Sequence, residues 1–206
     1  MSPSVSVLGG EVEWTGDNPF IYLSSDAGES WSVLALMFRI AWSVRGAGNA
    51  ILVLEKPGET APQGDALAFC ACDNEALARF LVEGFVPHFG VFRGQQGLAR
   101  LEFVAARDFD ERDGEDGAHE AACSTDTLGE VMLSWRQLRA PFAVDAPPPE
   151  TATGAHRMLS VFRPADAASI VVGGRQLEGS PIERDFFGGR SLSAGLAFSE
   201  SWIRVG

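Results

Sequence analysis

Residues 31–44, WSVLALMFRIAWSV, form the longest apolar stretch of the chain, and whether they form a strand or a helix decides the fold class. As a strand, the stretch places alternate side chains on one face: Leu34, Leu36, Phe38, Ile40, Trp42 and Val44. Leu, Ala and Met also favour a helix, so that alternative stays open. The GAGN sequence at 46–49 is typical of a turn, and another apolar run follows at 50–55. Two apolar runs around a turn favour a β-hairpin.

Further short runs with strand character follow along the chain. Their residues alternate in polarity or are apolar throughout between Gly and Pro: 66–72, 98–105, 130–135, 156–163, 169–172 and 196–205. One helix is expected over 74–85, capped by Asp73 or Asn74, with its apolar face on the sheet. These patterns predict a mainly β fold with one clear helix (α+β), an antiparallel barrel or sandwich in a single globular domain, 1–206.

Two segments, 10–72 and 129–201, share short matches in nearly the same order along the chain, and the expected helix lies between them. Arg39 and Arg163, for example, each follow a Phe in their segment. Matches of this length between common residues also arise by chance. The segments therefore indicate, as a hypothesis, two related β-meander halves.

Composition excludes several classes of protein. The chain has 206 residues, of which 46% are hydrophobic and 21% charged, so it can bury a core and is not mainly disordered. No apolar run reaches the ~18 residues that a membrane-spanning helix needs, so no membrane partner is expected. The formal net charge of −12 would repel nucleic acid, which is therefore not an expected partner either.

Cysteine content and the first residues favour a reduced, cytoplasmic protein. Three cysteines make an odd set, unlike the paired cysteines of a small secreted scaffold. The opening residues MSPSVSVLGG show no basic segment followed by an apolar core, as a signal peptide would.

No metal or cofactor site is indicated. The acidic run 108–120 departs from the EF-hand register and is expected to be a solvated loop. The HEAAC sequence at 119–123 resembles a helical zinc motif, but its Gly-rich acidic flank favours an exposed loop end. Cys70 and Cys72 share a strand face, where small buried thiols are more common than ligands.

The most specific feature is charge on otherwise apolar strand faces. Arg39 has the parity of Val33, Ala35 and Met37, and Arg163 takes its place in the second segment. Glu200 has the parity of neighbouring apolar residues: Leu196, Phe198 and Trp202. A buried guanidinium requires an anionic partner, because unpaired burial is costly.

Two interpretations of these charges remain. Arg39 forms a structural ion pair with Glu200, or is exposed where its strand reaches an edge. Alternatively, Arg39 and Arg163 bind the carboxylate of an apolar ligand in a cavity lined by Trp42 and Trp202.

Three classes of function follow. The favoured one is small-molecule binding, of an apolar carboxylate, in a β-barrel or sandwich cavity. An enzyme would need an acid–base pair, and Glu200 and His156 are the candidates, although no catalytic residue is identified. The third is a structural or assembly subunit, for example a homodimer, that pairs through exposed strand edges and aromatic patches. No motif in the chain identifies a known family.

Overall fold

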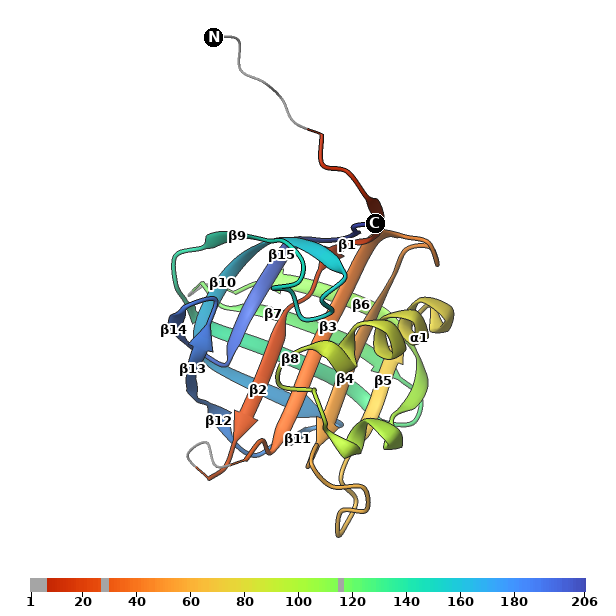
Figure 1. The fold of residues 1–206 in the computed structure, drawn as a ribbon. Coiled ribbons are helices and arrows are strands. Elements are labelled where there is room, and N and C mark those ends of the chain that lie inside the picture. The colour runs from red at the N-terminus through yellow and green to blue at the C-terminus, as the bar shows by residue number, and fades with distance from the viewer. Residues whose placement is uncertain (1–6, 27–29, 115–116) are drawn as a thin grey trace.

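The fold is mainly β, with one α-helix in the part of the chain that the structure describes (Figure 1). The structure is a computed structural model that describes residues 7–26, 30–114 and 117–206. The strands are β1 (Glu11–Asp17), β2 (Phe20–Ser24), β3 (Val33–Ser43), β4 (Gly48–Glu55), β5 (Ala68–Cys72), β6 (Glu102–Asp113), β7 (His119–Thr125), β8 (Gly129–Leu138), β9 (Phe142–Ala146), β10 (His156–Val172), β11 (Arg175–Gln176), β12 (Ser180–Pro181), β13 (Glu183–Phe186), β14 (Gly189–Leu192) and β15 (Ala194–Arg204). The helix is α1 (Glu75–Gly84), and two short 3-10 turns, η1 (Val86–His88) and η2 (Gln96–Arg100), follow it.

The apolar stretch 31–44 contains strand β3, which forms the expected hairpin with β4. Their register pairs Val33 with Glu55 and Ile40 with Gly48. The helical alternative is therefore wrong. Strand β3 is buried on both faces over most of its length, which explains why its sequence is continuously apolar instead of alternating.

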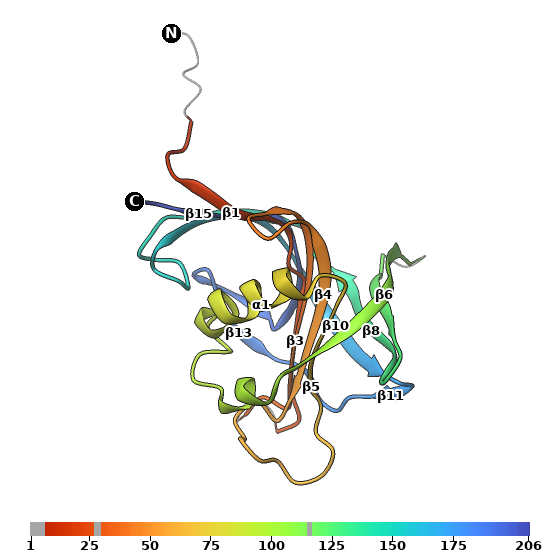
Figure 2. The ribbon, with the colours of Figure 1, turned by 90° about the vertical axis from the view of Figure 1, so that its right-hand side faces the viewer.

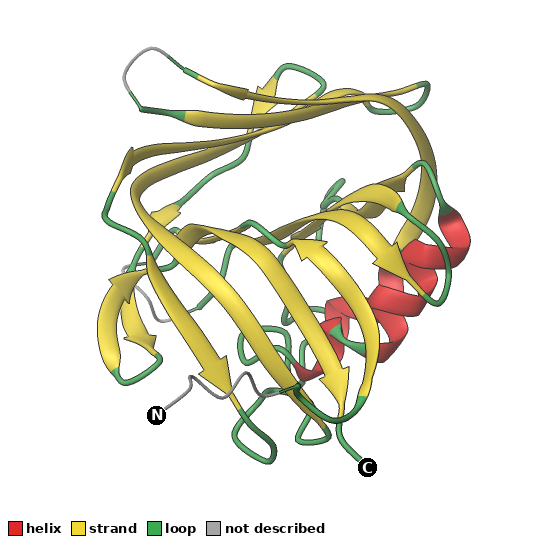
Figure 3. Cartoon of the chain, turned by 90° about the horizontal axis from the view of Figure 1, so that it is seen from above, coloured by secondary structure: helices red, strands yellow, loops and turns green. Residues whose placement is uncertain are grey.

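The large sheet closes into a ring, which Figure 3 shows from above. Its order is β10-β8-β7-β6-β5-β4-β3-β1-β15, and β10 returns to pair with β15. Closure works because β10 pairs with β15 through its first half and with β8 through its second half. All pairings in this ring are antiparallel except β5 with β6, where α1 lies in the connection between the two strands.

Two cores lie on opposite faces of β3 and its neighbours. One lies between these strands and α1 and contains Leu34, Leu36 and Phe38 of β3. The other lies inside the ring and contains residues of opposite parity, such as Val33 and Ala35. Figure 2 shows β3 and β4 between the helix on one side and β6 and β8 on the other.

Helix α1 begins as its sequence predicts. The Asn74 side chain accepts a hydrogen bond from the Leu77 backbone N–H at 3.1 Å and so caps the helix. The Asn74 amide also donates to the carbonyl oxygens of Arg45 and Ala47, which fixes the helix start against the turn after β3.

Three local predictions differ from the structure. The acidic run is a loop only around its tip, because residues 108–113 lie in β6 and 119–120 in β7, which pair as a hairpin. His119 is therefore buried in a strand instead of lying at an exposed loop end. The runs 156–163 and 169–172 belong to the one strand β10, which continues through Pro164 where its pairing changes from β15 to β8. Strand β6 begins only at Glu102, after the turn η2.

A β-bulge in β15 changes which core its side chains enter. Leu159 pairs with Ser201 and Val161 with Phe198, so Ser160 opposes two residues, Ser199 and Glu200. Ser199 has a left-handed φ of 50°. The extra residue inverts the alternation of the strand.

The bulge corrects the sequence interpretation of Glu200. Leu196 belongs to the core inside the ring, whereas Trp202 belongs to the core on the helix side. Glu200 therefore faces the side of Trp202 and not that of Leu196 or Phe198.

Strand β3 has a similar irregularity, because Thr15 pairs with Trp42 but Gly16 pairs with Ile40. Beyond Ile40 the expected single face of β3 is lost. Trp42 and Val44 are each 50% exposed, because the extra residue turns the end of the strand away from the core.

No helix in the described ranges is long and apolar enough to cross a membrane. The single-domain assignment and the internal repeat stay predictions.

We expect Ser199→Gly to raise the free energy of unfolding by about 0.5 to 1 kcal/mol. The left-handed conformation costs a residue with a Cβ about 1 to 2 kcal/mol, and the greater freedom of Gly in the unfolded chain offsets part of the gain. Ser199→Val should lower the same free energy by more than about 1 kcal/mol, because β-branched residues avoid this conformation. Urea unfolding measures both changes.

The matched control is Ser169, which lies in a regular part of β10 without positive φ. There the order should reverse, with Val tolerated and Gly destabilising. The same order at both positions would contradict the role of the bulge.

Candidate functional site

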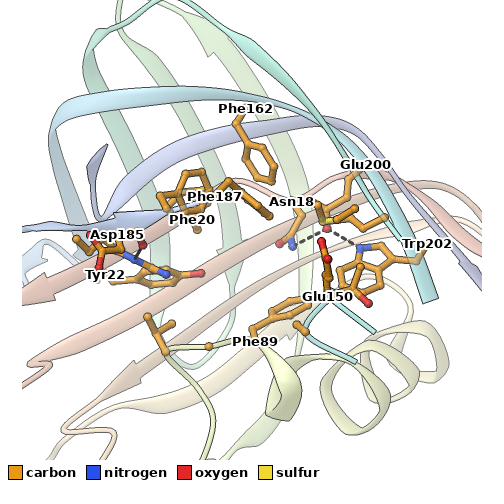
Figure 4. A pocket seen from close by; sticks show the side chains of 18 residues that line it. Asn18, Phe20, Tyr22, Phe89, Glu150, Phe162, Asp185, Phe187, Glu200 and Trp202 are labelled. Atoms are coloured by element: carbon orange, nitrogen blue, oxygen red, sulfur yellow. Dashed lines mark hydrogen bonds between the residues drawn. The ribbon is translucent and has the colours of Figure 1, made fainter. Parts of the chain in front are cut away.

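A cavity of about 230 Å³ lies on the helix side of the sheet (Figure 4). Strands β2, β10 and β15 form its floor, and two loop segments, 89–91 and 150–152, lie against it together with the hairpin of β13 and β14. The lining therefore comes from both ends and the middle of the chain.

Seven aromatic side chains line the cavity: Phe20, Tyr22, Phe89, Phe162, Phe186, Phe187 and Trp202. Their ring contacts form two groups, one of Phe89 with Trp202 and a larger one of the other five rings. Phe20 stacks on Tyr22 with ring centroids 5.1 Å apart, and Phe162 meets Phe186 edge to face at 5.0 Å. Such packing holds the wall in one arrangement.

Glu200 lies at one end of this cavity and is 2% exposed. The bulge at Ser199 turns its carboxyl group to this side of the sheet. Its Oε1 accepts hydrogen bonds from Trp202 Nε1 at 2.7 Å and from Asn18 Nδ2 at 3.3 Å. Within the described ranges no basic side chain forms an ion pair with Glu200, so the carboxyl group is buried without a counter-charge.

Burial raises the pKa of Glu200 from 4.5 to about 7. Hydrogen bonds from the side chains of Trp202, Asn18 and Ser160 oppose this shift, and the negative charge of Asp17 adds to it. Glu200 therefore changes its charge near neutral pH. Carboxyl groups with such raised pKa values are concentrated at functional sites.

Asn18 offers a second unsatisfied group beside Glu200. Its side chain is 6% exposed, and its Oδ1 is buried with no hydrogen-bond partner among the described residues. Asn18 lies between β1 and β2, where Pro19 follows it and interrupts the strand. A buried acceptor without a donor is costly, which marks this position as one that a bound group can satisfy.

The opposite end of the cavity carries Arg184. Its guanidinium lies over the ring of Tyr22, 5.7 Å from the centroid, and over that of Phe186 at 5.6 Å. Burial raises the pKa of Tyr22, so its hydroxyl group stays protonated. Arg184 is the basic side chain in a lining that also contains Glu150, Asp185 and Glu200.

Arg39 and Arg163 do not line this cavity. They meet at a different place, a charged groove at one end of the ring interior that Glu111 and His119 also line. Arg39 is 54% exposed and pairs with Asp17 and, at 3.2 Å from Nε, with Glu111. The expected Arg39–Glu200 ion pair is therefore wrong, because the bulge sends Glu200 to the other face.

His119 is the buried titratable group of the charged groove. Its Nδ1 lies 3.0 Å from Asp113 and its Nε2 lies 3.5 Å from Glu111. Glu111 raises the pKa of His119 most, burial opposes this, and Asp113 raises it further. The sequence placed His119 in a loop and so gave no sign of this contact.

The two candidates for an acid–base pair, Glu200 and His156, are not joined by a described hydrogen bond. His156 Nδ1 lies 2.8 Å from Thr153 Oγ1, and its Nε2 lies 3.3 Å from Glu13. Burial lowers the pKa of His156, which Glu13 partly opposes. Trp202 lies between them: its ring is 6.0 Å from that of His156, and its Nε1–H donates a hydrogen bond to Glu200.

Of the predicted ligand-binding residues, Trp202 lines the aromatic cavity, Arg39 and Arg163 line the charged groove, and Trp42 lines neither. Trp42 is half exposed beyond the irregularity in β3. Sequence reasoning missed Asn18, although the Asn-Pro break between two apolar strands was a visible signal.

The cysteines are buried free thiols. Burial raises the pKa of Cys72 to about 11 and that of Cys123 to about 12, so both stay protonated and unreactive. Across the described ranges, no three His, Cys, Asp or Glu side chains are placed to hold a metal ion together.

The chain matches no protein-family model and no curated protein sequence. Solved structures that match include an acetoacetate decarboxylase-like enzyme from Sphingomonas wittichii RW1. The identity is 12% and the TM-score 0.37, over 97% of this chain and 94% of that chain. A similarity at this level identifies no family for the chain.

The raised pKa of Glu200 makes a prediction for stability. The folded protein holds this proton more tightly than the unfolded chain, so the free energy of unfolding falls as pH rises from about 4.5 to about 7. Glu200→Gln keeps the shape and removes the titration. The variant should therefore gain stability over the parent by about 3 kcal/mol across this interval.

Urea unfolding of the two proteins at a series of pH values measures this difference. Other groups titrate in both proteins and cancel in the comparison. A difference that does not change between pH 4.5 and 7 would show that Glu200 titrates as an ordinary carboxyl group.

Proposed function

We propose that this protein binds a small, largely apolar molecule in the aromatic cavity, with Glu200 and Asn18 as the groups that orient it. One observation carries the proposal: a wall of aromatic side chains encloses a buried carboxyl group and a buried amide oxygen without a described partner. Mostly apolar walls with a few converging polar groups are the usual composition of ligand pockets.

The size of the cavity limits the ligand. Its volume of about 230 Å³ is just below the ~300 to 1,000 Å³ of pockets for drug-sized molecules. It corresponds to about eight water molecules at ~30 Å³ each. A single aromatic ring with a short substituent is therefore the class of ligand that fits.

Energetics favour an occupied cavity. The Asn18 Oδ1 and the Glu200 carboxyl group have lost water without a full set of partners, which costs free energy in the empty protein. A ligand that satisfies these groups and covers the aromatic faces recovers that cost. Binding therefore stabilises the folded state.

The sequence predicts a ligand carboxylate at Arg39 and Arg163. In the aromatic cavity such a carboxylate would have to bind a different arginine. Arg39 and Arg163 lie in the charged groove, and Arg184 is the basic group in the cavity lining. An apolar carboxylate that binds through Arg184 is thus the alternative ligand class at this site. Acid–base catalysis by Glu200 and His156 and assembly as a homodimer stay predictions.

The test is thermal unfolding and calorimetric titration with single-ring aromatic compounds of different charge. A ligand at about one hundred times its dissociation constant adds about 2.7 kcal/mol, which raises the melting temperature by a few degrees. Ala152→Phe puts a ring into the cavity lining and should abolish this rise.

Ala155→Phe is the matched control, because Ala155 is exposed in the same loop and does not line the cavity. This variant should bind as the parent does. Binding that survives Ala152→Phe unchanged would place the ligand elsewhere on the protein. The absence of a response to every compound would contradict small-molecule binding at this site.

A further inference from the structure

We propose that the ligand of the aromatic cavity carries a protonated amine, which Glu200 and Asn18 bind while the aromatic faces pack against its apolar part. This inference rests on the proposed function and names its ligand class. Three observations support it, two at the end of the cavity where Glu200 lies and one in the rest of the lining (Figure 4).

Glu200 has capacity for a cationic donor. The hydrogen bonds from Trp202 and Asn18 both end on Oε1, and the Ser160 hydroxyl beside the carboxyl group is a further neutral donor, so none of its neighbours supplies a positive charge. A buried carboxylate is stabilised best by a charge-assisted hydrogen bond from a cation. An ammonium group provides this bond and the missing counter-charge together.

Asn18 selects for a donor. Its amide nitrogen already donates to Glu200, and its buried Oδ1 has no described partner. An amide oxygen can only accept, so the group that satisfies it must carry a hydrogen. An ammonium has three N–H donors and can bond Glu200 and Asn18 at once, whereas a carboxylate would meet two acceptors.

The rest of the lining also favours positive charge. Glu150 adds a second carboxyl group to that of Glu200, against the one guanidinium of Arg184, while the carboxylate of Asp185 is paired with Arg190 at 3.2 Å. At the Glu200 end, the ring of Phe89 lies 5.8 Å from that of Trp202. Aromatic faces attract cations, and Trp does so most strongly. At the other end, Tyr22 and Phe186 already hold the guanidinium of Arg184 in this way.

The experiment compares three probes of the same size, benzylamine, benzyl alcohol and benzoate, by isothermal titration calorimetry at pH 8. At this pH Glu200 is mostly ionised and the amine mostly protonated. A hydrogen bond to a charged group is stronger than one between neutral groups. Benzylamine should therefore bind the parent protein at least about tenfold more tightly than benzyl alcohol, and benzoate most weakly.

Two variants locate the preference. Glu200→Gln keeps an acceptor for Trp202 and Asn18 but removes the charge, and it should abolish the preference for benzylamine while benzyl alcohol still binds. Glu130→Gln is the control, because it removes one carboxyl group at an exposed position of β8 that does not line the cavity. This control should keep the preference.

The outcomes separate this inference from the proposed function. Binding of benzyl alcohol or benzoate as tight as that of benzylamine would overturn the amine class and leave small-molecule binding intact. An unchanged preference in Glu200→Gln would overturn the role of Glu200. Failure of all three probes to bind the parent protein would contradict both the inference and the proposed function.

Discussion

The structure depends on the burial of β3 on both faces. Its even-numbered side chains pack against the helix layer and its odd-numbered ones fill the ring, so the strand joins two cores through one backbone. Main-chain hydrogen bonds to β4 on one edge, and to β2 and β1 on the other, satisfy its polar groups. Without this shared strand the ring and the helix layer would be two separate small cores.

The bulge at Ser199 converts this layered arrangement into a site. A regular β15 would direct Glu200 into the ring with Leu196 and Phe198. The extra residue directs it to the aromatic cavity instead, and the Ser199 N–H donates to Asp17 at 2.8 Å. Asp17 also pairs with Arg39 of the charged groove. One carboxylate thus stabilises the bulge that separates the two polar regions.

Alternation and turn signals predict β3, β4, β5, β8, β10 and β15, the helix and the barrel or sandwich class, because these depend on local periodicity. They miss β1, β2, β7 and β9. They were not sufficient for the site. The faces of Glu200 and Trp42 depend on single-residue bulges, which a count of alternate residues passes over. The pairing of β10 with β15 depends on contacts far apart in sequence. Trp202 is predictable because it is large and apolar, whereas the partners of Asn18 depend on the pairing of distant strands.

Ring closure also determines when the aromatic cavity can form during folding. Asn18 and Glu200 come from opposite ends of the chain, and β1 and β15 pair across that whole length. Contacts of such sequence separation form late in folding, since the entropy of a long loop opposes them. During synthesis, β1 and β2 must therefore wait for β15 before Asn18 can meet Glu200. The end of the cavity that holds Asn18 and Glu200 is therefore complete only once both ends of the chain have joined the sheet.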